Sequence, residues 1–192
     1  TPVISSAASD VYKRQALDAN RAKAQVANKC NLEISDIKKM TIWGNHSPTM
    51  YPDLDNAEIK GESASGWIND QNWIESDFLR IVQQRGKAII DARGASSATS
   101  AANAAIDTVK ATLSETPADD WFSAAVLSDG SYNVPEGLIF GFPLKADANG
   151  KVSIVQDLPI SDYAQEKIDL TTQELLDEKN DIEELLSLIH IS

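Results

Sequence analysis

The sequence predicts an α+β fold made of a long kinked helix, antiparallel strands and a C-terminal helix. Three observations support this. A helical pattern of apolar residues spans 73–113, three apolar runs lie within 121–160, and a second helical pattern runs from 162 to about 186. A block of helix followed by a block of strands is typical of α+β domains, whereas parallel sheets alternate strand and helix.

The first elements follow from local signals between residues 16 and 72. Asp18 is predicted to cap a helix whose interior, NRAKAQVANKC, is rich in good helix formers. Residues 39–43 are predicted to form a short buried strand that ends at Gly44, and 45–53, with two prolines, a loop. Residues 57–67 are expected to be a short polar strand pair or turn, with another helix beginning at Asn69.

The long helical region carries an apolar stripe with a mostly 3.6-residue period, formed by Phe78, Ile81, Val82, Ala88, Ile89 and Ile90. Gly94 predicts a kink or break in it. The small side chains of SSATSAANAA then permit close approach of another backbone, or leave room for a ligand. The runs WFSAAVL, GLIFGFPL and VSIVQDL are predicted strands, because DG, PEG and ANGK turn signals separate them.

Composition excludes several classes of protein. A net charge of −12 argues against a nucleic-acid binder and against docking on an anionic membrane. Residues 161–186 hold nine acidic and two basic side chains, which favours a solvated helix face. No apolar run approaches the roughly 20 residues needed to span a bilayer, and no secretory signal is visible. The single cysteine, Cys30, fits a reducing compartment, so we expect a cytoplasmic protein.

The two ends differ in character from the rest. Residues 1–15, TPVISSAASDVYKRQ, show no clear helical or strand period, and 187–192, SLIHIS, follow an acidic helical pattern abruptly. Both strings resemble translated sequencing-adaptor sequence, so we expect a non-native extension and a non-native tail around a domain at 16–186. The alternative is a genuine arm and tail. His190 is set aside with the tail.

The remaining histidine, His46, is a candidate for proton transfer because it lies in a loop directly after a predicted buried strand. Taken alone, a loop histidine of this kind is more often structural or incidental. Asp18 and Arg21 are three residues apart and share a helix face. Taken alone, they are compatible with a helix cap and a nearby arginine.

The combination of motifs resembles malate dehydrogenase of the cytosolic-like type, in the lactate/malate dehydrogenase superfamily. The resemblance runs from about Ala16 into the C-terminal helix. Its motifs, in order, are LDANRAKAQVA, TIWGNHSPTMYPD, QQRGKAIIDARGASSATSAANAAID and SDGSYNVPEGLIFGFP. It implies the interconversion of malate and oxaloacetate, and hence a place in malate metabolism and the tricarboxylic acid cycle. A lactate dehydrogenase relative, with the same Asp–Arg–His arrangement, is the alternative.

The resemblance also implies roles for single residues. His46 matches the family's catalytic acid/base, and Asp18 matches its catalytic partner, which fixes the imidazole tautomer. Arg21 matches the arginine that clamps the substrate carboxylate, a task suited to its planar fork. Ser96 aligns with a small polar residue of the substrate pocket, although Ser97 could be the one that faces in.

No G-x-G-x-x-G turn occurs in the sequence, so we expect the cofactor-binding Rossmann half to be absent from this chain. The family default implies NAD as cofactor and a homodimer as assembly, while NADP stays open. One cysteine and one usable histidine make no metal-ligand cluster. The alternative for this 192-residue chain taken by itself is an inactive or dimerising fragment.

Overall fold

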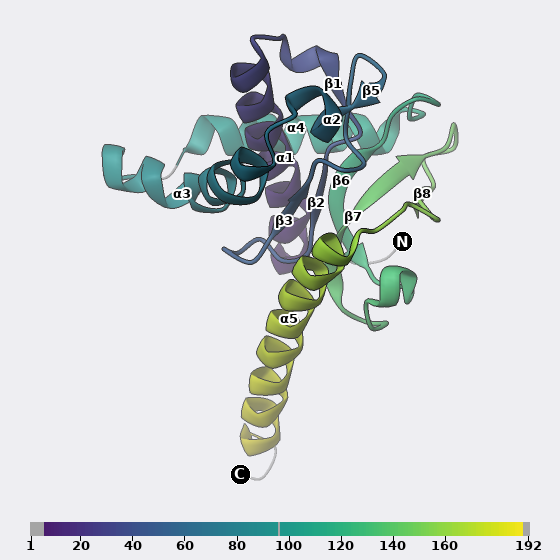
Figure 1. The fold of residues 1–192 in the computed structure, drawn as a ribbon. Helices are drawn as coiled ribbons and strands as arrows, with labels where there is room; N and C mark the ends of the chain where they lie inside the picture. Colours follow the sequence, from purple (N-terminus) through teal and green to yellow (C-terminus); the bar gives the residue numbers. More distant parts are fainter. Residues whose placement is uncertain (1–5, 96, 190–192) are drawn as a thin grey trace.

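A computed structural model describes residues 6–95 and 97–189, with side chains for 15–95 and 97–182. Its elements follow one another as an α+β arrangement of helices and small antiparallel sheets (Figure 1). The predicted fold class is therefore confirmed. None of the helices in this described part is both long enough and apolar enough to cross a membrane.

The first helix, α1 (Ser6–Cys30), begins well before Asp18, so the prediction that Asp18 caps it is wrong. Residues 6–15 contain no proline or glycine, and a helix already packed further along extends through them readily. Gln15 is buried, and its Nε2 donates to the carbonyl of Gly44 at 2.7 Å. Its Oε1 has no hydrogen-bond partner among the described residues. The origin of residues 1–15 and 187–192 stays a prediction.

Short strands follow α1, and the strand predicted at 39–43 begins at Thr41. Lys39 has a positive φ of 58°, and its backbone N–H turns aside to donate to Asp120 Oδ1 at 2.7 Å. The predicted polar strand pair is present and leads into a short helix. The elements are a 3₁₀ turn (Ile34–Asp36), β1 (Ile37–Lys38), β2 (Thr41–Trp43), β3 (Tyr51–Asp53), β4 (Glu58–Ile59), β5 (Glu62–Ser63) and α2 (Ala64–Ile68). β2 pairs with β3, and β4 pairs with β1 and β5, all antiparallel.

The long helical region breaks where the sequence predicts. A π-helical segment (Trp73–Phe78) leads into α3 (Leu79–Arg93), and α4 (Ala98–Leu113) follows. Gly94 ends α3 in the left-handed conformation, with φ 69°, and its N–H donates to Ile90. The apolar stripe is buried at its beginning, at Phe78 and Val82, but Ile90 is 49% exposed.

The three apolar runs form one antiparallel sheet with the order β6-β7-β8. Its strands are β6 (Phe122–Leu127), β7 (Ile139–Ala146) and β8 (Val152–Ile154), with a 3₁₀ turn (Ser131–Asn133) between the first two. β2 joins this sheet through a single bridge, at which Gly44 and Gly141 exchange both backbone hydrogen bonds. A Cβ at Gly141 would lie 2.6 Å from the carbonyl oxygen of Ile42, so the close approach requires glycine.

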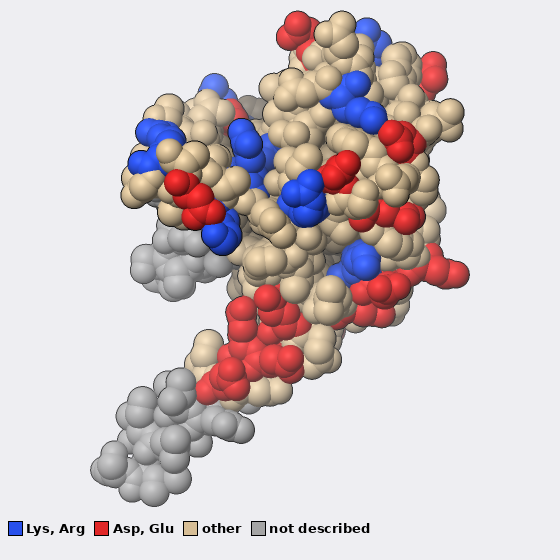
Figure 2. Space-filling view, turned by 60° about the vertical axis from the view of Figure 1, so that its left-hand side comes forward, with Lys and Arg blue, Asp and Glu red and all other residues tan. Residues whose placement is uncertain are grey.

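The last helix, α5 (Asp162–Ile189), packs against the sheet with its first turns and then projects away from the rest (Figure 1). Acidic side chains gather along this helix (Figure 2), and most of them are exposed, as a solvated face requires. Glu174 differs, because it is half-buried and hydrogen-bonded to the loop that carries His46.

Asp53 is a buried carboxylate in the apolar cluster around Trp43. Its oxygens accept from Trp43 Nε1 at 3.0 Å and Asn56 Nδ2 at 2.9 Å, and from the backbone N–H groups of Asp55 and Asn56. Burial raises the pKa of this carboxyl, and the hydrogen bonds from Asn56 and Trp43 oppose that shift. The carboxylate thus joins β2, β3 and the following turn.

Replacing Asp53 with alanine is expected to lower the free energy of unfolding by about 3 kcal/mol, because buried donors lose their acceptor. Urea unfolding of the purified protein measures it. Asp55→Ala is the matched control, since Asp55 is exposed and accepts from Ser161 at the surface. Equal losses in both variants would contradict a stabilising role for the buried carboxylate.

Candidate active site

Asp18, Arg21 and His46 meet at the junction of α1 and the loop after β2. Asp18 is fully buried, and its Oδ1 accepts from Arg21 Nη1 at 3.0 Å. Its other oxygen, Oδ2, is hydrogen-bonded to Nδ1 of His46. The carboxylate therefore lies between the guanidinium and the imidazole, and the structure brings together three of the four residues that the sequence singled out.

This arrangement fixes the orientation of the imidazole. A carboxylate accepts hydrogen bonds, so Nδ1 carries the proton directed at Asp18. Within the described part of the chain, Nε2 of His46 has no hydrogen-bond partner, and the side chain is 23% exposed. A histidine held in this way can accept a proton at Nε2 and later return it, while Asp18 stabilises the imidazolium.

Arg21 lies beside a cavity of about 510 Å³ between α1, α3 and α4. Its side chain is only 13% exposed, and one of its amino groups is engaged by Asp18. Among the described residues, Nη2 and Nε of Arg21 have no hydrogen-bond partner, so both can pair with a carboxylate. Gly86 of α3 faces this guanidinium, and a Cβ there would lie 3.7 Å from Nη1. The residues around Arg21 that line the cavity are Leu17, Asn20, Ala24, Gln25, Asn28, Arg85, Ile89, Thr99, Ser100 and Asn103.

The fourth predicted residue, Ser96, lies outside the described residues. Its neighbour Ser97 is half-buried at the start of α4, where its carbonyl accepts from the N–H of Ala101 at 3.2 Å. The assignment of a small polar residue to the pocket stays a prediction.

Sequence reasoning missed the groups that hold the His46 loop from the other side. Thr171 and Glu174 of α5 hydrogen-bond to Asn45 and Thr49, and Glu174 also binds Ser47. No local pattern could have paired them with His46, because they are more than 120 residues away along the chain. The half-buried position of Glu174 is visible only in the folded chain.

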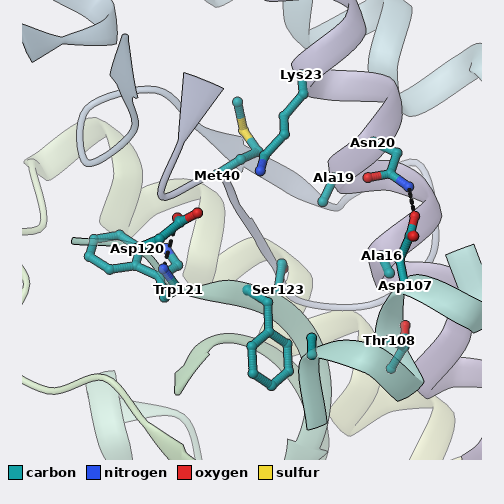
Figure 3. A pocket seen from close by; sticks show the side chains of 12 residues that line it. Ala16, Ala19, Asn20, Lys23, Met40, Asp107, Thr108, Asp120, Trp121 and Ser123 are labelled. Atoms are coloured by element: carbon teal, nitrogen blue, oxygen red, sulfur yellow. Dashed lines mark hydrogen bonds between the residues drawn. The ribbon is translucent and has the colours of Figure 1, made fainter. Parts of the chain in front are cut away.

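A second cavity, of about 200 Å³, lies between α1, α4 and the start of β6 (Figure 3). Lys23 points into it, and Asn20 at its edge donates to Asp107 at 3.0 Å. Burial lowers the pKa of the Lys23 ammonium, which the charges of Asp120 and Asp107 oppose. Because neither Asp18, Arg21 nor His46 lines this cavity, it is separate from the candidate site. Among the described residues, no group of three or more His, Cys, Asp or Glu could hold a metal ion.

Known dehydrogenases resemble this chain in sequence and in fold. Residues 16–186 match the family model of the lactate/malate dehydrogenase alpha/beta C-terminal domain. The malate dehydrogenase of Naegleria fowleri is 42% identical, with a TM-score of 0.82, over 88% of this chain and 52% of that one. The lactate dehydrogenase of Trichomonas vaginalis, solved with NADH and oxamate, is 30% identical, with a TM-score of 0.83, over 90% of this chain and 54% of that one.

A malate dehydrogenase from Salinibacter ruber, 21% identical with a TM-score of 0.77 over 90% of this chain and 54% of that one, shares the fold. The chain thus spans about half the length of the solved relatives. The family match and the solved relatives agree in sequence and in fold, and the chain belongs to the lactate/malate dehydrogenase family, as its alpha/beta C-terminal domain.

Proposed function

We propose that this chain is the substrate-binding part of an NAD-dependent dehydrogenase that interconverts (S)-malate and oxaloacetate. The observation that carries the proposal is the Asp18 carboxylate, which contacts both His46 Nδ1 and Arg21 Nη1. This one buried group sets the orientation of a proton-transfer residue and holds a carboxylate-binding residue beside it.

The proton step follows from that geometry. In malate oxidation, Nε2 of neutral His46 accepts the proton of the C2 hydroxyl while the C2 hydride would leave for the NAD⁺ bound by the complete dehydrogenase, and Asp18 stabilises the imidazolium that forms. In the reverse direction the same nitrogen returns the proton to the developing alkoxide of oxaloacetate. Arg21 pairs with the C1 carboxylate and fixes the distance from C2 to His46.

In this proposal the dinucleotide-binding site does not lie on this chain. The sequence contains no G-x-G-x-x-G turn, which in Rossmann domains cradles the pyrophosphate. NAD binding is therefore proposed for the complete dehydrogenase, and this chain contributes the proton-transfer and carboxylate-binding groups. The presence of NADH in the solved Trichomonas vaginalis relative supports the choice of cofactor.

Malate is favoured over lactate because the Naegleria fowleri malate dehydrogenase is 42% identical to this chain and the Trichomonas vaginalis lactate dehydrogenase 30%. The test is kcat/KM of the complete protein for oxaloacetate and for pyruvate, each with NADH. We expect a clear preference for oxaloacetate. A preference for pyruvate would assign the chain to a lactate dehydrogenase, and turnover of neither keto acid would refute the proposal.

We also propose that the 192-residue chain is not catalytic by itself. Its family members are about twice as long, and no phosphate-binding glycine turn occurs in the sequence. With NADH and oxaloacetate, the purified chain is expected to give no loss of the absorbance of the reduced nicotinamide. Measurable turnover that disappears in a His46→Gln variant would contradict this.

We also propose that the complete protein is a homodimer in the cytoplasm. An apolar stripe on the outer face of α4 supports association, because Ile106, Val109 and Leu113 are 54%, 54% and 78% exposed. The half-buried free thiol of Cys30 is compatible with a reducing compartment. Sedimentation equilibrium should give the mass of a dimer, and Val109→Glu should shift it toward the monomer. A monomeric wild-type protein would rule the dimer out.

A further inference from the structure

The loop that carries His46 is attached to α5 through one carboxylate oxygen. Oε2 of Glu174 accepts from Asn45 Nδ2 at 3.3 Å and from Thr49 Oγ1 at 2.6 Å, and it also accepts from Ser47 Oγ. These three donors lie on either side of His46. Hydrogen bonds to a charged acceptor are among the stronger ones in proteins, so this attachment resists displacement of the loop.

Thr171, one helical turn before Glu174, holds the backbone of the same loop. Its side chain is fully buried, and Oγ1 lies 2.9 Å from the N–H of Asn45, which donates to it, and 3.0 Å from Thr49 Oγ1. Gly44 packs directly against it. The φ of Gly44 is 92°, and a Cβ there would clash with the Thr171 methyl group.

The attachment reaches His46 itself through Asn45. The side-chain oxygen of Asn45 accepts from the backbone N–H of His46 at 2.8 Å, while its Nδ2 donates to Glu174 and to Glu178. The His46 backbone is thus fixed from α5, and the His46 ring is fixed from α1 by Asp18. Two helices on different sides of the loop determine where Nε2 lies.

We propose that Glu174 and Thr171 are positioning residues for His46, so that α5 contributes to proton transfer without contacting substrate. This inference rests on the proposed role of His46. Catalysis depends on holding reacting groups within a fraction of an ångström, and a loop freed on one side samples geometries that do not transfer the proton.

The test compares Glu174→Ala with Asp177→Ala in the complete dehydrogenase. Asp177 lies on the same helix and is also an acid, and within the described part of the chain it accepts only from exposed Gln173, so it controls for the loss of an acid from α5. Glu174→Ala is expected to lower kcat by about 10- to 100-fold with unchanged KM for NADH, whereas Asp177→Ala leaves kcat at the wild-type value. Glu174→Gln keeps one acceptor oxygen at the same reach and should recover most of the loss.

A second readout follows His46 without turnover. Diethyl pyrocarbonate modifies accessible imidazoles, and its rate at His46, measured by mass spectrometry of the peptide, should rise in Glu174→Ala but not in Asp177→Ala. If Glu174→Ala fails to fold, Thr49→Val replaces it, because valine has the shape of threonine without the donor to Glu174. Wild-type kcat and wild-type modification rate in the folded variant would overturn the inference. Full turnover in His46→Gln would instead refute the proposed function, even if the modification rate responded to Glu174.

Discussion

Replacing His46 with glutamine in the complete dehydrogenase is expected to lower kcat for oxaloacetate reduction by about 10³-fold. Glutamine has no group that exchanges a proton near neutral pH, so the alkoxide that forms on hydride transfer has no acid beside it. The Kd for NADH should not change, because the proposed role of His46 is proton transfer and the proposed cofactor site lies outside this chain. Steady-state kinetics and fluorescence titration with NADH measure the two quantities.

Asp18→Asn is expected to act on the same step through the imidazole. An amide can present its NH₂ group to Nδ1 and thereby favour the tautomer in which Nε2 carries the proton, which costs about 10²-fold or more in kcat. Asp70→Asn is the control, since the side chain of Asp70 is 41% exposed and pairs with Lys29. If His46→Gln or Asp18→Asn retained the turnover of the control, the assigned proton step would be wrong.

Replacing Arg21 with lysine is expected to lower kcat/KM for oxaloacetate by about 10²-fold, although the positive charge is kept. Lysine can still pair with Asp18, but a single ammonium cannot meet both oxygens of a carboxylate in a fixed plane. Losing one charge-assisted hydrogen bond costs about 1.5–3 kcal/mol, and the substrate also loses its orientation relative to His46.

The control for Arg21 is Arg80→Lys on α3, because Arg80 pairs with Asp77 by the same i,i+3 spacing but is exposed. Its kcat/KM should equal that of the wild-type protein. An equally active Arg21→Lys variant would mean that the substrate carboxylate is bound by another group of the cavity, such as Arg85, which also lines it.

Periodic and turn signals predict the elements well where the interactions are local. Gly94 breaks the long helical region because it adopts the left-handed conformation that other residues disfavour, and the three apolar runs pair as an antiparallel sheet. Two predictions at helix and strand boundaries are wrong. Asp18 lies inside α1, where its carboxylate is buried against Arg21 and His46. The strand predicted at 39–43 begins only at Thr41, because the N–H of Lys39 bonds to the distant Asp120.

The residues of the candidate site, too, are predicted from the sequence only in part. Asp18 and Arg21 share a helix face because of their spacing, and the resemblance of the motifs to known dehydrogenases connects both residues with His46. Ser96 stays a prediction. The acidic pattern of 161–186 predicts a solvated face for Glu174 as for its neighbours, and this is wrong for that one residue, because the loop after β2 folds over it.

By itself, the sequence determined the α+β class, the position of the helix break and the residues of the Asp–Arg–His cluster. Each of these depends on the spacing of residues along the chain or on the resemblance of a motif to that of known dehydrogenases. Only the tertiary structure decided which oxygen of Asp18 meets His46, and that Thr171 and Glu174 hold its loop. It also placed Gly44 against Gly141 and Thr171. These contacts join segments far apart in the chain, and they arise from the packing of α1, β2, β7 and α5, which no local pattern encodes.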